Sequence, residues 1–186
     1  MSNSSAIEEA AAKTEFTQFG YVRVESLKFY DEVREICKTN KCGKYGTSWA
    51  CPPATGTVEE CKERVSKYSK MLLFSKVYLL EDSFDFEGMM AGAVDFKELT
   101  GRFRSNIPGT VSNYLLLSNE GCKQCKSCTY PNAPCRFPEL LHHSLEGYGF
   151  VVSELAREAG IKYNNGPDTV TYFGAILFNE ECKLKY

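Results

Sequence analysis

The sequence predicts an α/β (or α+β) fold, with a small central sheet, flanking helices and two cysteine-rich loops. Apolar, strand-like runs alternate with segments whose apolar residues recur at helical spacing, a pattern typical of layered folds. The chain has 186 residues, 43% of them hydrophobic, which is enough for one hydrophobic core. Most of its nine cysteines fall in two stretches rich in Gly and Pro, which disfavour regular helix. We expect residues 1–16 to be a flexible N-terminal tail and residues 17–186 to form a single domain.

Four segments have the composition of strands. The segment around Tyr21 alternates weakly between apolar and polar residues, as a half-buried strand does. The other three are continuous apolar runs, which are typical of buried strands. The predicted strands span residues 17–25, 71–80, 113–118 and 169–178.

Five segments have apolar residues at helical spacing. Ser26 is expected to cap the first helix, which delivers Cys37 at its end. Thr57 and Glu60 form a T-x-x-E capping box at the start of the second. The predicted helices span residues 27–37, 58–68, 86–103, 139–147 and 150–159.

Charge and hydropathy exclude two classes of partner. The formal net charge is −2 and no basic stripe is present, so nucleic acid is not an expected partner. The longest apolar stretch, residues 71–80, is broken by Ser75 and Lys76 and is too short to span a bilayer. The N-terminus has no basic start followed by an apolar run, so it is not a secretory signal. We therefore expect a cytoplasmic protein that does not bind membranes.

Nine cysteines in such a chain point to metal or redox chemistry. Structural disulfides are rare in a reducing cytoplasm, and an odd total cannot be fully paired. The stronger motif is C-x2-C-x2-C-x6-C, followed by Arg136 and Pro138. Three thiolates at two-residue gaps can bind three corners of a cubane cluster, whereas zinc sites more often combine separated pairs. We predict an iron–sulfur cluster of the [4Fe-4S] type, with a structural zinc ion as the alternative. The predicted ligands are Cys122, Cys125, Cys128 and Cys135.

A second cysteine group precedes it, with the spacing C-x4-C-x8-C. Its members Cys37, Cys42 and Cys51 are predicted to hold a further cluster, shielded from water by Tyr45 and Trp49. The sequence leaves several alternatives for the fourth ligand of this triple. Cys61, which equally suits the apolar face of its helix, and Cys135 are both candidates. The third alternative is an iron with no fourth protein ligand, able to bind a substrate or exogenous ligand.

A few other polar residues could take part in chemistry. His142 and His143 are the only histidines, and Glu146 would share a helical face with His142. That pair suits a proton relay or an ordinary exposed pair, and a histidine there could also be a non-cysteine ligand. Arg136 could offset cluster charge or bond loop carbonyls. Cys182 has no neighbouring partner and is expected to be a free thiol.

The two motifs together resemble a known family. The pattern C-x4-C-G-K-Y-G-x-x-W-x-C-P-P, followed by C-x2-C-x2-C-x6-C-R-x-P, resembles the predicted metal-binding protein family, domain of unknown function number 2284. The resemblance runs from about Phe29 to Phe178 and includes an E-x-x-G at residues 146–149. It implies metal binding, of iron–sulfur type, without implying a particular reaction.

Three functions fit these residues. The first is electron transfer, or small-molecule redox chemistry, by one or two clusters that serve a redox partner protein or a small-molecule ligand. The second is an enzyme that uses an open iron of the Cys37/Cys42/Cys51 triple as a Lewis acid or sulfur acceptor. The third is a structural zinc-binding module.

Overall fold

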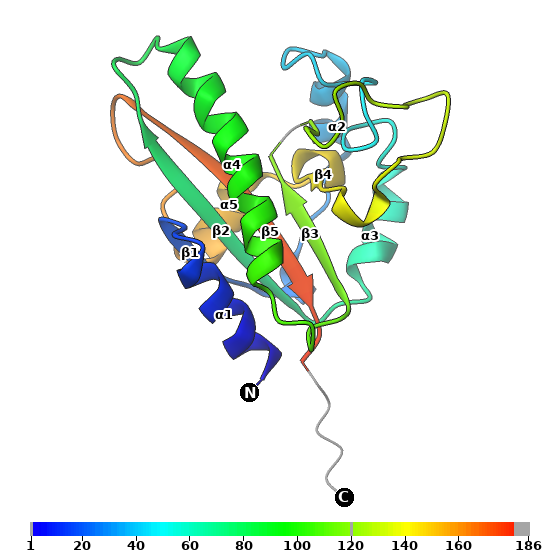
Figure 1. Cartoon of the computed structure of the whole chain (residues 1–186), viewed down its shortest axis with the longest axis vertical. Helices are drawn as coiled ribbons and strands as arrows, with labels where there is room; N and C mark the ends of the chain where they lie inside the picture. The colour runs from blue at the N-terminus through cyan, green and yellow to red at the C-terminus, as the bar shows by residue number, and fades with distance from the viewer. Residues whose placement is uncertain (1, 120, 181–186) are drawn as a thin grey trace, which may run out of the picture.

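The computed structural model describes residues 2–119 and 121–180, whose strands form one open mixed sheet in the order β1-β2-β5-β3-β4 (Figure 1). The first four strands in this order pair antiparallel, and β4 runs parallel to β3 at the edge. The four predicted strands are confirmed, and the two-residue β4 is an addition. The strands are β1 (Gln18–Val22), β2 (Lys70–Leu79), β3 (Tyr114–Ser118), β4 (His143–Ser144) and β5 (Thr169–Phe178).

Helices cover both faces of the sheet, which confirms the mixed layered fold. On one face α1 and α4 pack over β2 and β5, and on the other α3 and α5 complete a second hydrophobic cluster (Figure 1). Within the described ranges, no helix is both long enough and apolar enough to cross a membrane. The helices are α1 (Asn3–Lys13), α2 (Asp31–Lys38), α3 (Val58–Val65), α4 (Phe86–Asn106) and α5 (Val152–Glu158).

The N-terminal segment differs from the expected flexible tail. Residues 3–13 form α1, and Ile7 is fully buried in the core that α4 also lines. Phe16 stacks on Phe74, with ring centroids 4.2 Å apart. The expectation failed because the buried face of α1 consists mostly of alanines, whose weak hydrophobicity resembles that of a solvated helix.

The two regions beside the cysteines also differ from expectation. The helix that carries Cys37 begins at Asp31, because residues 27–30 stay extended after a 3₁₀ turn, so Ser26 is not its cap. Residues 139–147 are not a helix: β4 lies between the 3₁₀ turns η2 (Pro138–Leu140) and η3 (Glu146–Tyr148). The backbone there bonds to neighbouring segments instead, from Ser144 N–H to the Ala50 carbonyl and from Leu145 N–H to the Ser118 carbonyl. The supposed helical face shared by His142 and Glu146 therefore does not exist.

Candidate metal centre

The first cysteine loop, residues 39–57, is folded by its own hydrogen bonds. Asn40 ends α2 in the left-handed region (φ 54°), and its side-chain oxygen accepts the Tyr45 N–H at 2.9 Å. Farther along, the Gly46 N–H donates to the Pro52 carbonyl at 2.8 Å, with Gly46 itself at φ 67°. These contacts turn the chain back on itself, so that Cys42 returns toward the C-terminal end of α2.

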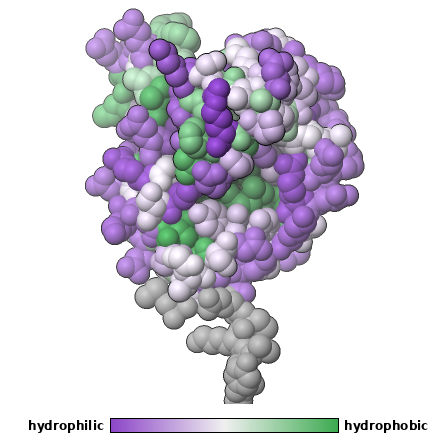
Figure 2. Space-filling model, turned by 45° about the vertical axis from the view of Figure 1, so that its right-hand side comes forward, coloured by the Kyte–Doolittle hydropathy of each residue, from purple (hydrophilic) through white to green (hydrophobic). Residues whose placement is uncertain are grey.

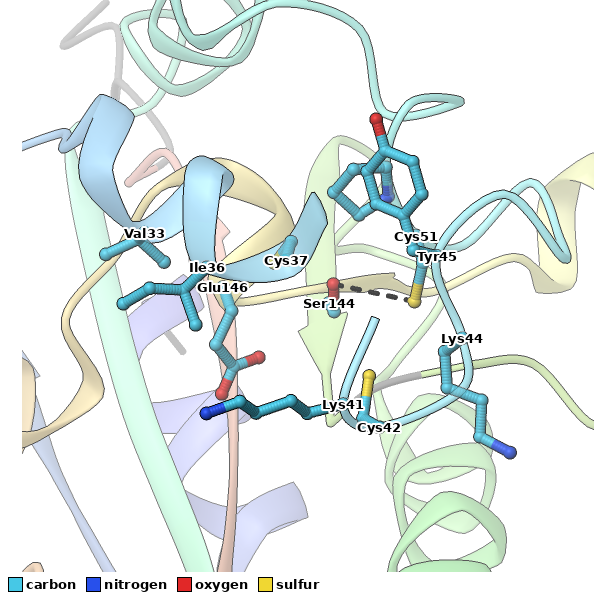
Figure 3. Close-up of a pocket in the computed structure, with 11 residues that line it drawn as sticks. Val33, Ile36, Cys37, Lys41, Cys42, Lys44, Tyr45, Cys51, Ser144 and Glu146 are labelled. Atoms are coloured by element: carbon cyan, nitrogen blue, oxygen red, sulfur yellow. Dashed lines mark hydrogen bonds between the residues drawn. The ribbon is translucent and has the colours of Figure 1, made fainter. Parts of the chain in front are cut away.

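This fold brings the Cys37/Cys42/Cys51 triple to one cavity of about 260 Å³ (Figure 3). Apolar side chains from α2 and Pro52 form much of its wall. The polar groups in its lining come from the loop lysines and from the segment that contains β4 and η3. The lining residues are Val33, Ile36, Cys37, Lys41, Cys42, Lys44, Tyr45, Cys51, Pro52, Ser144 and Glu146.

Two of the three thiols in this cavity, those of Cys37 and Cys51, are disposed to stay protonated until a metal binds. Burial raises the pKa of Cys37 to about 11, and the Glu146 carboxylate adds to the rise. Burial also raises the pKa of Cys51, which the Gly121 N–H opposes by donating to Sγ at 3.0 Å. Metal binding at this site would have to displace these protons.

The second cysteine loop surrounds a neighbouring cavity of about 320 Å³. Its chain reversal is held by the Ala133 N–H donating to the Thr129 carbonyl and by Arg136 Nη1 donating to the Ser127 carbonyl at 2.8 Å. Arg136 thus bonds a loop carbonyl, one of its two expected roles. The four predicted ligands all line this cavity: Cys122, Cys125, Cys128 and Cys135.

The two cavities adjoin, because their loops are bonded to each other. Lys44 lines both cavities. Trp49 from the first loop donates through Nε1 to the Ala133 carbonyl of the second at 3.2 Å, and its ring meets Tyr130 edge-on at 5.0 Å. On the sheet side, Lys97 Nζ on α4 donates to the Gly121 carbonyl at 3.0 Å. The cysteine groups, distant in sequence, therefore form one continuous region.

The positions of the other candidate side chains reduce the number that could be the fourth ligand of the Cys37/Cys42/Cys51 triple. Cys61 is fully buried in the core beneath α3, where its thiol faces the Thr55 carbonyl at 3.5 Å, and it lines neither cavity. Cys135 lines the cavity of the second loop, together with the other three cysteines of that loop. Glu146, which sequence reasoning considered as a partner for His142 and as part of the E-x-x-G at residues 146–149, lines the cavity of the triple. Cys182 lies outside the described residues.

His142 is buried and His143 is half-buried, whereas an exposed position was an alternative for both. His142 is only 7% exposed, its Nε2 has no hydrogen-bond partner among the described residues, and burial lowers its pKa to about 3. His142 lines a third, smaller cavity together with Cys122. His143 Nδ1 lies 3.1 Å from the Tyr148 hydroxyl, and burial lowers the pKa of His143 to about 4.

Cysteine thiols are the metal-binding groups common to both cavities. Across residues 2–119 and 121–180, no group of three or more His, Cys, Asp and Glu side chains has the geometry to hold one metal ion. The donors that the two loops offer are nonetheless almost entirely thiols, which suit zinc, copper(I) or iron–sulfur clusters. The donor chemistry fits a metal centre.

Comparison with known proteins agrees with this donor chemistry. A family model described as predicted metal-binding protein (DUF2284) matches residues 20–178. No curated protein and no solved structure matches the chain significantly.

Proposed function

The chain belongs to the family of predicted metal-binding proteins (DUF2284), and we propose that its two cysteine loops hold iron–sulfur clusters that carry electrons. The clusters are of the [4Fe-4S] type. Cys37, Cys42 and Cys51 hold one, and the group from Cys122 to Cys135 holds the other. The electrons pass to a redox partner protein or to a small-molecule ligand.

The observation that carries this proposal is that seven thiols line two adjoining cavities. Four surround one cavity and three surround the other. A tetrahedral zinc ion needs its sulfur ligands about 2.3 Å from one centre. A cubane distributes its ligands over separate iron corners, so its thiolates lie farther apart. Seven thiols around two adjoining cavities are more than the four that one zinc ion needs, and this number supports clusters.

The protein around the thiols has two features that suit a redox centre. When bound, the clusters would supply reversible one-electron transfer. Backbone N–H groups face two of the sulfurs: Gly121 donates to Cys51, and Tyr130 lies 3.5 Å from Cys128 Sγ. Such bonds stabilise negative charge on sulfur and tune the reduction potential. The adjoining cavities would keep two clusters close enough to exchange electrons.

A second function is favoured by one observation. The Cys37/Cys42/Cys51 cavity has apolar walls and space beside its thiols, as small-molecule sites do. An iron of this triple that accepts a substrate atom would make the protein an enzyme, with Lewis-acid or sulfur-acceptor chemistry.

The test compares cysteine variants after anaerobic reconstitution with iron and sulfide. Cys125→Ser and Cys37→Ser should each lose about half of the bound iron and visible absorption, because each removes a ligand of one cluster. Cys182→Ser, outside both motifs, is the control and should keep the full content. Equal iron content in the three variants and in the protein of unaltered sequence would refute the ligand assignment. Loss only in Cys125→Ser would restrict the protein to one cluster.

A further inference from the structure

The Cys37/Cys42/Cys51 triple has three thiols for a cubane with four corners, and Glu146 is the additional metal-binding side chain in its cavity. Figure 3 shows Glu146 reaching into the cavity from η3, on the side opposite Cys51, with Cys37 and Cys42 nearby. We propose that the Glu146 carboxylate is the fourth protein ligand of the metal centre held by this triple. The proposal rests on the proposed function, because it needs a cluster there.

Helix α2 fixes the position of this carboxylate. Arg34 lies one turn before Cys37 and donates through Nη1 to the Gly147 carbonyl at 2.7 Å. Its Nη2 donates to the Gly56 carbonyl at 2.8 Å, so the same side chain also holds the end of the cysteine loop. At the start of the helix, the Tyr30 N–H donates to the Gly149 carbonyl at 2.9 Å. Gly147 in the middle of η3 and Gly149 just after it are thus tied to the helix that carries Cys37, and Glu146 has a built place beside it.

The electrostatics of the cavity favour a cation between these groups. Three thiols and a carboxylate share a partly apolar enclosure, and ionising the thiols beside Glu146 is unfavourable without positive charge. Bound iron would supply that positive charge, because the thiolates and the Glu146 carboxylate would all be its ligands. Lys41 points toward Glu146, so its ammonium group can offset part of the remaining negative charge of a ligated cluster (Figure 3).

Carboxylate ligation has a chemical consequence that thiolate ligation lacks. A carboxylate oxygen is a harder ligand than sulfur and suits the iron–sulfur environment less well. The Glu146-bound iron would be the labile corner, the first lost on oxidation and the one that a small ligand in the cavity could reach.

The test follows the three-iron EPR signal of the full chain during mild oxidation. The wild-type protein should develop this signal on oxidation, and Glu146→Gln should show it before oxidation, because the amide is a poorer ligand. Glu146→Cys should suppress it, since a thiolate then holds the fourth iron. Glu139→Gln removes an exposed carboxylate that lines neither cavity, and it should behave as wild type.

Two outcomes distinguish failure of the Glu146 proposal from failure of its premise, which is that the triple holds a cluster. If Cys37→Ser lowers the iron content but both Glu146 variants behave as wild type, Glu146 is not a ligand and the cluster assignment stands. If Cys37→Ser leaves the iron content unchanged, the proposed function of this site fails as well. Circular dichroism of each variant checks folding. If Glu146→Gln is unstable, Glu146→Cys still tests the proposal. A thiolate ligand at this position predicts tighter retention of the fourth iron, which a structural defect cannot produce.

Discussion

The backbone N–H of Gly121 donates a hydrogen bond to Sγ of Cys51 at 3.0 Å, across 70 positions of the sequence. Gly121 directly precedes Cys122, so the entrance of the second cysteine loop contacts a predicted ligand of the first. Lys97 holds this turn by bonding the carbonyls of Asn119 and Gly121. The two cysteine groups are thus connected through one backbone contact, and their properties should be coupled.

Replacing Gly121 by alanine should disturb that contact. Gly121 has φ 76°, where an L-residue costs about 1 kcal/mol, and an added Cβ would lie 3.4 Å from the Lys44 side chain. A weakened N–H···S bond stabilises the reduced cluster less, so the reduction potential should fall. Gly109→Ala, where an added Cβ meets nothing within 4 Å, is the matched control. Unchanged potentials in both variants would show that this bond does not tune the cluster.

Trp49 offers an optical measure of loading at the second cavity. It is the only tryptophan, and it lines the Cys122–Cys135 cavity but not that of the triple. A cluster with broad visible absorption should quench its fluorescence by energy transfer. We expect Cys125→Ser to relieve this quenching more than Cys37→Ser does. Equal relief would place the quenching centre elsewhere.

The N-terminal segment that contains α1 and Phe16 should contribute strongly to stability. Phe16 is 8% exposed and lies against the rings of Phe74, Phe96 and Phe103. Truncation to alanine removes this packing and should lower the free energy of unfolding by about 3–5 kcal/mol. Urea denaturation measures the change. A loss below about 1 kcal/mol would mean that the segment behaves as a loosely attached tail.

The buried histidines predict acid sensitivity. The pKa of His143 is lowered from 6.5 to about 4, chiefly by burial and then by Arg64. The unfolded chain therefore binds more protons between these values, and stability present above pH 6.5 is lost as the pH falls toward 4. At about 1.4 kcal/mol per pKa unit, the loss from this residue is about 3 kcal/mol. His143→Gln should flatten the pH dependence of urea unfolding in metal-free protein. An unchanged slope would show that His143 does not stay neutral in the fold.

Much of the fold could be predicted from local signals. The strand β5 has the predicted bounds, and the Thr57–Glu60 capping box forms with both of its hydrogen bonds. These signals are local because a continuous apolar run and a cap depend on neighbouring residues alone. Helix α1 was missed because alanine is only weakly apolar, and β4 because two residues carry no periodicity.

The candidate site was predictable only in part. Regular spacing identified both cysteine groups, since close thiols in a loop leave a sequence signature. No sequence signal linked Glu146 to the triple: it meets the triple only because β4 pairs with β3 and Arg34 ties η3 to α2. The core position of Cys61 was likewise undecidable from its helical spacing, which suits a core residue and a ligand equally. The positions of Glu146 and Cys61 are both determined by tertiary contacts, which the spacing of residues in the sequence does not show.

The account is tested most directly by measuring iron, acid-labile sulfide and zinc in anaerobically purified protein of unaltered sequence. Two [4Fe-4S] clusters predict about eight iron and eight sulfide ions per chain, with little zinc. A colourless protein that contains stoichiometric zinc and no sulfide would contradict the account.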